Sequence, residues 1–205
     1  MPSHTNKNQI YSNAKKGILI AEPLERGFGL TLGNAIRRIL LSSLQGAAIT
    51  SVKIKGVIHE FSTISGVKED LTDILLNLKT VAVKVHSSGL KKMYPKSNGS
   101  GELRAGNFET DSETEIMNPD QLIMTLDSNA DVEIEANVET GKGYVSAEVA
   151  EDENKVIGEI KLDAMFSPVV KASYKIENSR VGQVTDFDKL VFEVETNGAI
   201  TPDDA

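Results

Sequence analysis

Three observations predict an α+β fold for this chain of 205 residues. Several segments alternate apolar and polar residues, which is the spacing of β-strands. Only two stretches, residues 30–44 and 67–80, place apolar residues at helical spacing. Strands and helices do not follow one another in regular alternation, as they would in a doubly wound parallel sheet. The length allows one or two compact units with a hydrophobic core.

The amino-terminal part is predicted to pass from a strand through a turn into the longer helix. Residues 17–21 form a short apolar run, which favours a strand. Residues 22–29 contain a proline and two glycines and are expected to form a turn. Residues 30–44 then show helical spacing, and Gly46 just after them is typical of a helix end.

The rest of the chain is predicted to consist mostly of strands. The second helix, 67–80, follows a break at Ser65 and Gly66. Residues 86–115 are rich in glycine, serine and acidic residues, so we expect hairpins and surface loops there. The predicted strands are residues 49–58, 81–85, 131–138, 156–162, 169–177 and 189–195, with a turn at 141–143.

The last residues carry the signals of a helix start. Thr201 is a suitable N-cap, Pro202 suits the first helical position, and the two aspartates that follow suit the positive end of a helix dipole. We therefore expect that a helix begins here and that the chain is truncated at Ala205. The alternative is a frayed polar tail.

Charge is distributed unevenly along the chain. The formal net charge is −8, from 22 Lys and Arg against 30 Asp and Glu. Residues 1–55 carry eight basic and two acidic side chains, whereas residues 102–155 carry three basic and fifteen acidic ones. Acidic segments repel phosphates, so direct nucleic-acid binding by the middle of the chain is not expected. The basic amino-terminal part could instead face an acidic protein partner.

The composition excludes several kinds of functional site. The chain has no cysteine, which excludes disulfides, thiolate metal sites, iron–sulfur clusters and a cysteine nucleophile. Its three histidines, His4, His59 and His86, are too few for a histidine metal cluster. Asp186 and Asp188 are expected at a solvated hairpin or a cap rather than around Mg²⁺. No catalytic residue, metal or cofactor is therefore predicted.

No segment predicts export or membrane insertion. The first residues are polar and lack the apolar stretch of a signal peptide. No run of 18 apolar residues occurs, so no helix is expected to span a membrane. A cytoplasmic protein without a membrane partner is expected.

Gly27, Gly29 and Gly33 resemble part of a nucleotide-binding loop between a strand and a helix. In such a loop, glycines let the backbone approach a phosphate at the helix N-terminus. Here, however, the next predicted strand ends near Lys55 and Gly56 instead of an acid that would bind a ribose hydroxyl. A nucleotide-binding enzyme that uses these glycines is kept as the alternative function.

The predicted helix 30–44 places apolar side chains on two sides, although a surface helix of a monomer normally has one apolar face. Its arginines are costly to bury unless partners accept their hydrogen bonds. We therefore expect the helix to be buried against two different partners, the alternative being a central helix of one core. One side holds Phe28, Leu32, Ala35, Ile36, Ile39 and Leu40, and the other holds Asn34, Arg38, Leu41 and Gln45, with Leu30, Arg37 and Leu44 beside it.

Residues 22–43, EPLERGFGLTLGNAIRRILLSS, resemble the amino-terminal domain of the bacterial RNA polymerase α subunit. Four more segments agree with that family in the same order. They are GVIHEFSTISGVKEDLTDILLNLK at 56–79, GKGYV at 141–145, IGEIKLDAMFSPV at 157–169 and DFDKLVFEVETNG at 186–198. The resemblance therefore extends over nearly the whole chain.

The resemblance implies two subdomains and a role in assembly. Residues 1–45 together with 169–205 would form a dimerisation α/β subdomain, and residues 46–168 would form an inserted, mostly β subdomain. The chain would be a non-catalytic subunit of DNA-directed RNA polymerase, without a cofactor. Two copies would dimerise and provide the platform for the β and then the β′ subunit. A free homodimeric scaffold outside the polymerase is the weaker alternative.

The resemblance also implies roles for residues of the first helix. Further β contacts would lie near 164–174 and 184–199 and in the loop 56–67. The family's promoter-contacting carboxy-terminal domain is absent from this chain, so no direct DNA contact is expected, and the protein would be nucleoid-associated only as part of the polymerase. The dimer interface would contain Leu24, Phe28, Leu32, Ile36 and Ile39, and the β-subunit contact would contain Asn34, Arg37, Arg38 and Leu41.

Overall fold

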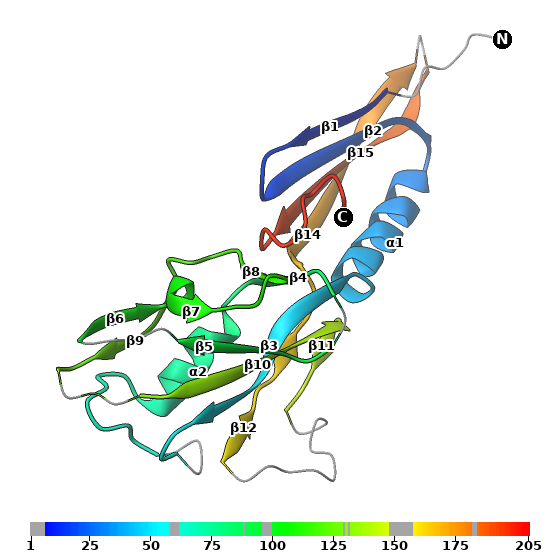
Figure 1. The fold of residues 1–205 in the computed structure, drawn as a ribbon. Coiled ribbons are helices and arrows are strands. Elements are labelled where there is room, and N and C mark those ends of the chain that lie inside the picture. The colour runs from blue at the N-terminus through cyan, green and yellow to red at the C-terminus, as the bar shows by residue number, and fades with distance from the viewer. Residues whose placement is uncertain are drawn as a thin grey trace. The chain divides into compact units, whose positions relative to one another are not determined.

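The computed structural model describes residues 7–57, 62–87, 89–95, 100–128, 130, 132–147, 158–181 and 184–205. In this part of the chain, strands predominate and two α-helices are present, which confirms the predicted α+β class. The chain divides into two compact units (Figure 1). The first unit comprises Met1–Leu44 and Ser167–Ala205, and the second unit comprises Gln45–Phe166.

The first unit contains a four-stranded antiparallel sheet that joins both ends of the chain. Ile20 pairs with Val191, for example, although 170 residues separate them in sequence. Because long ladders of backbone hydrogen bonds stabilise them, the two carboxy-terminal strands extend beyond the predicted ranges 169–177 and 189–195. In sheet order the strands are β1 (Lys7–Ser12), β2 (Lys16–Glu25), β15 (Val184–Thr196) and β14 (Val169–Val181).

β2 corrects the prediction of a turn over residues 22–29. The strand continues through Glu25, which pairs with Phe187 of β15, and Leu24 pairs with Asp188. The proline at position 23 suggested a turn locally, but the distant partner strand supplies the hydrogen bonds that keep this segment extended. The turn is therefore confined to the residues just before the helix.

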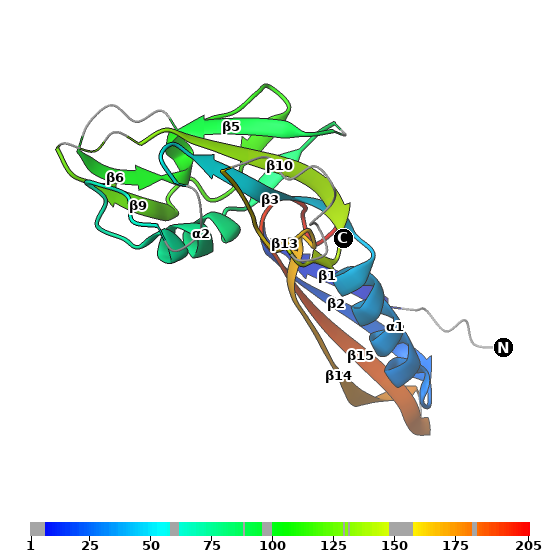
Figure 2. The ribbon, with the colours of Figure 1, turned by 90° about the horizontal axis from the view of Figure 1, so that it is seen from below.

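Helix α1 (Phe28–Ser42) lies along β14 and β15, as Figures 1 and 2 both show. It begins two residues before the predicted helix 30–44 and ends two residues earlier. Gly27 precedes it with φ of 84°, a left-handed conformation that favours glycine. The core beneath it consists of Leu40, Val169, Ala172 and Phe192, with Leu19, Ile36, Leu44, Tyr174, Val194 and Ala205 packed around them.

Gly33 allows α1 to approach the sheet closely. A Cβ atom at this position would lie 2.6 Å from the ring of Tyr174 on β14, a distance that no side-chain carbon tolerates. The Tyr174 ring in turn stacks on Phe192 of β15, with 6.2 Å between the ring centroids and 6° between the planes. The helix therefore rests on a stacked aromatic pair through a residue that has no side chain.

The second unit is built on a six-stranded path with one further strand attached. Its order is β7-β5-β10-β3-β4-β8, and β12 pairs with β3. Two separate strand pairs, β6 with β9 and β11 with β13, complete the unit. The bounds are β3 (Gln45–Ile54), β4 (Val83–Val85), β5 (Lys91–Pro95), β6 (Gly101–Arg104), β7 (Phe108–Glu109), β8 (Thr114–Ile116), β9 (Leu122–Leu126), β10 (Ile134–Lys142), β11 (Tyr144–Val145), β12 (Glu159–Lys161) and β13 (Ala164–Met165), with a short 3-10 turn at Ala105–Asn107.

Helix α2 (Leu71–Lys79) closes the core of the second unit, and Figure 2 shows it beside β9. Its buried residues are Leu71, Ile74, Leu75 and Leu78, which recur at helical spacing. The helix starts four residues later than the predicted range 67–80. Val67 forms a bridge with Leu126 instead, so the preceding residues are tied to β9 and are not helical.

Several other strand boundaries differ from the prediction. The predicted strand 49–58 is displaced to Gln45–Ile54, because Gly56 with φ of 80° turns the chain after β3. β10 continues through Lys142, and the predicted turn 141–143 is reduced to Gly143, whose φ is 66°. The predicted strand 131–138 becomes Ile134–Lys142 and 156–162 becomes Glu159–Lys161. β1 and β9 were not predicted at all.

The carboxy-terminal residues form one hydrogen-bonded turn. The backbone N–H of Asp204 donates to the carbonyl of Thr201 at 3.1 Å, and the Thr201 hydroxyl donates to the Asp204 carboxylate at 2.7 Å. Pro202 packs against Gly17 of β2, where a Cβ would lie 2.6 Å from the proline ring. The predicted helix start is therefore represented by a single turn anchored on the sheet.

Replacing Gly33 with alanine tests the close approach of α1. Alanine normally stabilises a helix interior by roughly 1 kcal/mol relative to glycine. Here the added methyl group would collide with the Tyr174 ring, so we expect Gly33→Ala to lower the free energy of unfolding by about 1–3 kcal/mol. Urea unfolding measures the change. Thr31→Ala on the exposed side of α1 is the control and should stay within about 0.5 kcal/mol of the original chain.

Candidate protein-binding surface on helix α1

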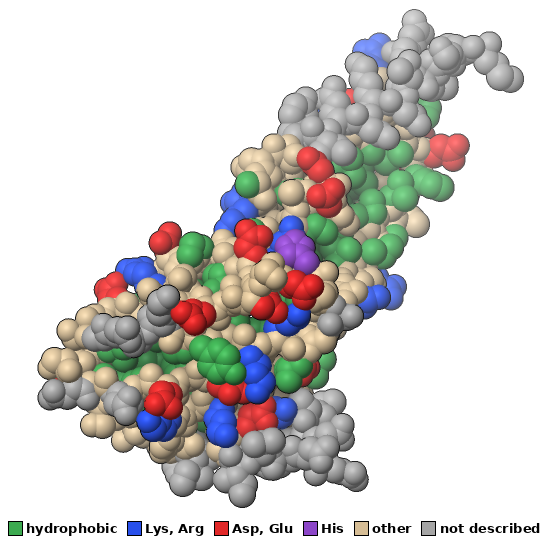
Figure 3. Space-filling model, in the orientation of Figure 1, with side chains coloured by type: hydrophobic (Ala, Val, Ile, Leu, Met, Phe, Trp, Pro, Cys, Tyr) green, Lys and Arg blue, Asp and Glu red, His purple; other side chains and the backbone are tan. Residues whose placement is uncertain are grey.

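The side of α1 that faces the sheet contains Gly29, Gly33, Ile36 and Leu40. At about 100° per residue, this leaves two flanks outside the packed face. The first flank consists of Phe28, Leu32, Ala35 and Ile39, and the second flank consists of Leu30, Asn34, Arg37, Arg38 and Leu41. Figure 3 shows hydrophobic side chains gathered over α1.

Large apolar side chains on both flanks are exposed. Phe28 is 54% and Ile39 is 55% exposed on the first flank, and Leu30 is 52% exposed on the second. Single exposed apolar residues are normal on a protein surface, but a continuous group along one helix is typical of an interaction site. The helix therefore presents two candidate contact surfaces.

The five residues expected at a dimer interface have different environments. Phe28 and Ile39 are exposed and Leu32 is half-buried, all three on the first flank. Leu24 is half-buried on β2. Ile36 packs against the core formed by Leu40 and Phe192, so its side chain contributes to the fold of the subunit itself. The sequence spacing predicted that Ile36, Leu40 and Phe28 share one face of the helix. In the structure, Leu40 is buried in the core and Ile36 packs against it, whereas Phe28 is exposed.

The four residues expected to contact a second kind of subunit are all exposed and share the second flank. They are Asn34, Arg37, Arg38 and Leu41. Among the residues that the structure describes, no acidic side chain forms an ion pair with Arg37 or Arg38. The helix itself contains no Asp or Glu. The second flank therefore combines exposed leucines with two guanidinium groups that lack an acidic partner within the described chain.

Tyr174 is a neighbour of the second flank that the sequence did not predict. Its hydroxyl donates a hydrogen bond of 2.8 Å to the Asn34 side-chain oxygen. β14 and α1 are 140 residues apart at this contact, so local sequence spacing contains no signal for it. The one indication in the sequence is the glycine at position 33, because a glycine within a helix can mark a place where a large side chain of another element packs against the helix backbone.

Gly27 and Gly29, which resembled part of a nucleotide-binding loop, belong to the N-terminal cap of α1. The backbone N–H groups of Gly27 and Gly29 donate to one carboxylate oxygen of Asp188, at 2.8 Å and 3.2 Å. A Cβ on Gly29 would lie 3.1 Å from the same carboxylate. An anion at a helix N-terminus is stabilised by free N–H groups and the helix dipole. Asp188 therefore already occupies the place that a nucleotide phosphate would need.

Asp186 and Asp188 have different roles. Asp188 caps α1, whereas Asp186 forms an exposed ion pair of 3.4 Å with Arg26. The sequence predicted a hairpin or a cap for this pair of acids, and the structure shows that Asp188 caps a helix 159 to 161 residues away. The described residues contain no group of three or more potential metal ligands.

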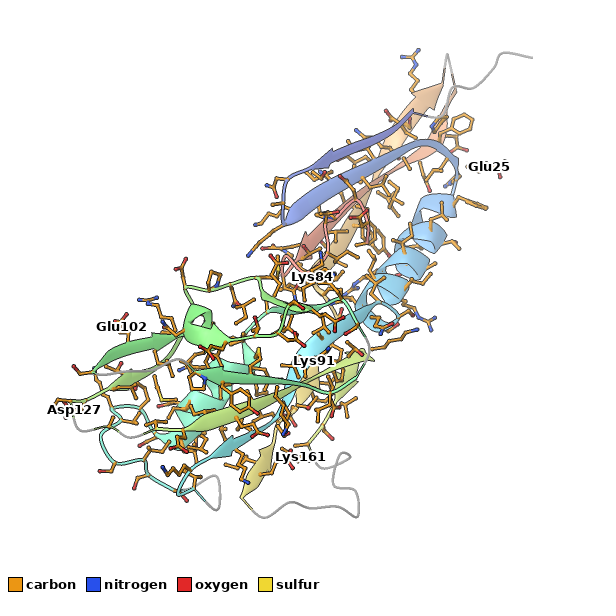
Figure 4. The ribbon with its side chains drawn as sticks, viewed as in Figure 1. Glu25, Lys84, Lys91, Glu102, Asp127 and Lys161 are labelled. Atoms are coloured by element: carbon orange, nitrogen blue, oxygen red, sulfur yellow. The ribbon has the colours of Figure 1, made fainter. Side chains whose placement is uncertain are left out.

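One group of ionisable side chains in the second unit joins a strand to a loop. Lys91, labelled in Figure 4, lies 3.1 Å from Asp111 and 2.5 Å from Glu113. Hydrogen bonds to Glu113 and Asp111 raise the pKa of Lys91, and the hydrogen bonds from Lys91 and Ser87 lower the pKa of Glu113. These ion pairs connect the half-buried Lys91 of β5 to the segment before β8, which is a structural role.

Glu69 ties the segment before α2 to β9. Its carboxylate accepts hydrogen bonds from the backbone N–H of Thr125 at 2.6 Å and from the Thr125 hydroxyl at 2.8 Å. Burial alone raises the pKa of Glu69, but the two hydrogen bonds from Thr125, together with a backbone hydrogen bond of Glu69 itself and the charge of Lys68, bring the net pKa below the ordinary value. The charged form of Glu69 therefore stabilises the fold.

His59 and Glu60 lie outside the described residues, as do the whole acidic stretch 151–153 and part of the loop 56–67 in which further contacts were expected. Of the two α-helices in the described part of the chain, neither has the length and hydropathy needed to cross a membrane.

α1 has exposed apolar side chains on two flanks while its third side packs on its own sheet, a distribution that is typical of proteins that bind other proteins. The family model of the RNA polymerase Rpb3/RpoA insert domain matches residues 52–167, more than half of the chain. The chain therefore belongs to this family and is a subunit of DNA-directed RNA polymerase of the α type. The matched residues correspond closely to the second unit.

Removing the Asp188 carboxylate should destabilise the first unit. Asp188→Ala leaves two helix N–H groups without their acceptor, so we expect a loss of about 1–2 kcal/mol in the free energy of unfolding. Thermal or urea unfolding measures it. The matched control is Asp186→Ala on the same strand, whose exposed ion pair should contribute less than about 1 kcal/mol. Equal losses for both variants would contradict the capping role.

The contribution of Glu69 should depend on pH. A carboxyl group whose pKa is lowered in the folded state stabilises the protein above its unfolded pKa, and this stability is lost as the pH falls through the folded pKa. We therefore expect Glu69→Gln to cost roughly 1–2 kcal/mol at pH 7 and less at pH 3, which lies below the ordinary pKa of a carboxyl group. Unfolding curves at both pH values test this. Glu139→Gln, which removes an exposed carboxylate from β10, should show no comparable pH-dependent difference.

Proposed function

We propose that this chain is a non-catalytic assembly subunit of bacterial DNA-directed RNA polymerase. Two copies dimerise through the first flank of α1, and the dimer is the platform on which the β subunit and then the β′ subunit assemble. The observation that carries the proposal is that both flanks of α1 are exposed while the side between them is occupied by the subunit's own sheet. Membership of the RNA polymerase family supplies the kind of assembly.

The chemistry of the first flank supports a contact between two copies. A twofold interface requires a surface that is complementary to itself, and an apolar ridge can pack against its own copy. Phe28 and Ile39 are more than half exposed, so covering each would contribute about 1 kcal/mol or more. In this proposal, residues Met1–Leu44 and Ser167–Ala205 form the dimerisation subdomain and Gln45–Phe166 form the insert.

The chemistry of the second flank supports capture of a different subunit. A guanidinium group binds carboxylates through two parallel hydrogen bonds, which lysine cannot do. Arg37 and Arg38 are exposed beside Leu41, so this flank can combine apolar contact with directed hydrogen bonds. We assign the β-subunit contact to this flank, with further contacts from 164–174 and 184–199.

The proposal gives the chain no reaction of its own. Nucleotide addition would be carried out by the other subunits, and the chain would need no cofactor. The net charge of −8 disfavours contact with DNA phosphates. The protein would work in the cytoplasm, at the nucleoid, as part of the polymerase.

The alternative of a nucleotide-binding enzyme is not favoured. The amide groups that would bind a phosphate already donate to Asp188. A free homodimeric scaffold would also dimerise, but it would not bind the β subunit. Binding of the β subunit therefore distinguishes this alternative from the proposed assembly subunit.

Light scattering of the chain mixed with purified β subunit tests the proposal. We expect a complex of two copies with one β subunit. Arg38→Ala should weaken β capture by at least about 30-fold, because truncating a buried arginine at an interface typically costs about 2 kcal/mol or more, while the dimer persists. Ile39→Asp should instead prevent dimerisation, because it places a charge on the apolar first flank.

Each of these variants is the control for the other. If Arg38→Ala captures β as the original chain does, the assignment of the second flank is wrong. If Ile39→Asp leaves a stable dimer, the assignment of the first flank is wrong. A dimer that never binds β would support the free scaffold instead.

A further inference from the structure

The second flank presents hydrogen-bond donors almost exclusively. Arg37 and Arg38 have five N–H donors each and no acceptor. Asn34 has both a donor and an acceptor, but its side-chain oxygen already accepts the hydroxyl hydrogen of Tyr174 at 2.8 Å. This hydrogen bond directs the oxygen toward Tyr174 and uses one of its two lone pairs, whereas neither N–H donor of the Asn34 amide has a partner among the described residues, so both can serve a bound subunit. Since α1 also contains no Asp or Glu, no acceptor of opposite charge interrupts the flank.

Tyr174 is well placed to fix the direction of this amide. Its ring stacks on Phe192, which is 1% exposed, and it also lies directly beneath Gly33. Because the core holds the ring from both sides, the hydroxyl cannot move far from its position on β14. The hydrogen bond to Asn34 therefore connects a rigid part of the core to an exposed side chain of α1.

We propose that Tyr174 is a positioning residue for subunit capture, and that the second flank fits an acidic, acceptor-bearing surface of the β subunit. The Tyr174 hydroxyl holds the Asn34 oxygen inward and directs its NH₂ outward, beside Arg38 one helical turn away. The matching partner surface carries carboxylate and carbonyl oxygens. This inference rests on the proposed function, because it takes the β subunit as the occupant.

Fixing the Asn34 amide would increase the selectivity of the second flank for its partner surface as well as the affinity. A free asparagine can turn either its oxygen or its nitrogen toward a partner, and an oxygen facing a carboxylate leaves both acceptors without a donor. Fixing the amide removes this unfavourable arrangement and reduces the conformational entropy lost on binding. A surface that offers donors instead of acceptors would be rejected by the same flank.

A double-mutant cycle tests the positioning role. Tyr174→Phe removes only the hydroxyl, and we expect it to weaken β capture about 3- to 10-fold. In an Asn34→Ala background the same change should have no further effect, because the side chain that it positions is gone. If Tyr174→Phe weakens capture by the same factor in both backgrounds, the hydroxyl acts through the general stability of the fold and the inference is wrong. Tyr94→Phe, an exposed tyrosine of β5, is the matched control and should leave capture unchanged.

The polarity of the partner surface is tested by Asn34→Asp. This change keeps an acceptor for the Tyr174 hydroxyl but replaces the outward NH₂ with an oxygen. We expect it to weaken β capture more than Asn34→Ala does, by over about 10-fold at low salt and by less at high salt, because like charges then oppose each other. Binding that equals or exceeds that of the original chain would show that the partner offers donors and would overturn the inference.

Measuring Arg38→Ala in the same assay distinguishes failure of the proposed β-subunit contact from failure of the positioning role of Tyr174. If Arg38→Ala leaves β capture unchanged, the proposed function itself fails. If Arg38→Ala weakens capture while Tyr174→Phe does not, only the positioning role of Tyr174 fails.

Discussion

The close contact between α1 and its sheet is the interaction on which the first unit depends. Gly33 lets the helix touch the ring of Tyr174, and that ring is held in turn by Phe192. At the start of the helix, one carboxylate oxygen of Asp188 accepts hydrogen bonds from two backbone N–H groups. One end of α1 is therefore fixed electrostatically and its middle sterically, both by strands from the carboxy-terminal part of the chain. The orientation of the helix follows from these contacts.

This orientation decides which side chains remain for partners. With Leu40 turned into the core, residues to either side of it along the helix surface must face outward. The first flank is then apolar and the second flank combines leucines with Arg37 and Arg38. A helix that is held this firmly loses little further freedom on binding, so its exposed groups are preorganised for contact. The fold of the subunit and its proposed role in assembly thus share one structural cause.

The second unit has a different design. Its core is closed by α2, and many of its strands are short and joined by connecting segments without regular secondary structure. Contacts such as Glu69 with Thr125, and Lys91 with Asp111 and Glu113, tie those connections to the strands. This is the part of the chain that matches the RNA polymerase insert domain, and it interrupts the first unit in sequence. Among the described residues, none of its strands belongs to the four-stranded sheet of the first unit.

The sequence by itself determined the α+β class, both helices to within four residues of their starts, and the presence of apolar residues on two sides of α1, because these features depend on periodic spacing along the chain. It also predicted seven of the fifteen strands of the described residues. It did not determine β1, which forms a local hairpin with β2, or β9, which pairs with β6. It also did not determine the extension of β2 through Glu25, since pairing with the distant strand β15 stabilises that segment. Only the tertiary structure decided that Ile36 packs inward, that the glycines serve close packing and capping, and that Tyr174 binds Asn34. Each of these outcomes depends on groups that lie far apart in sequence and meet only when the sheet forms, so no local pattern could contain them.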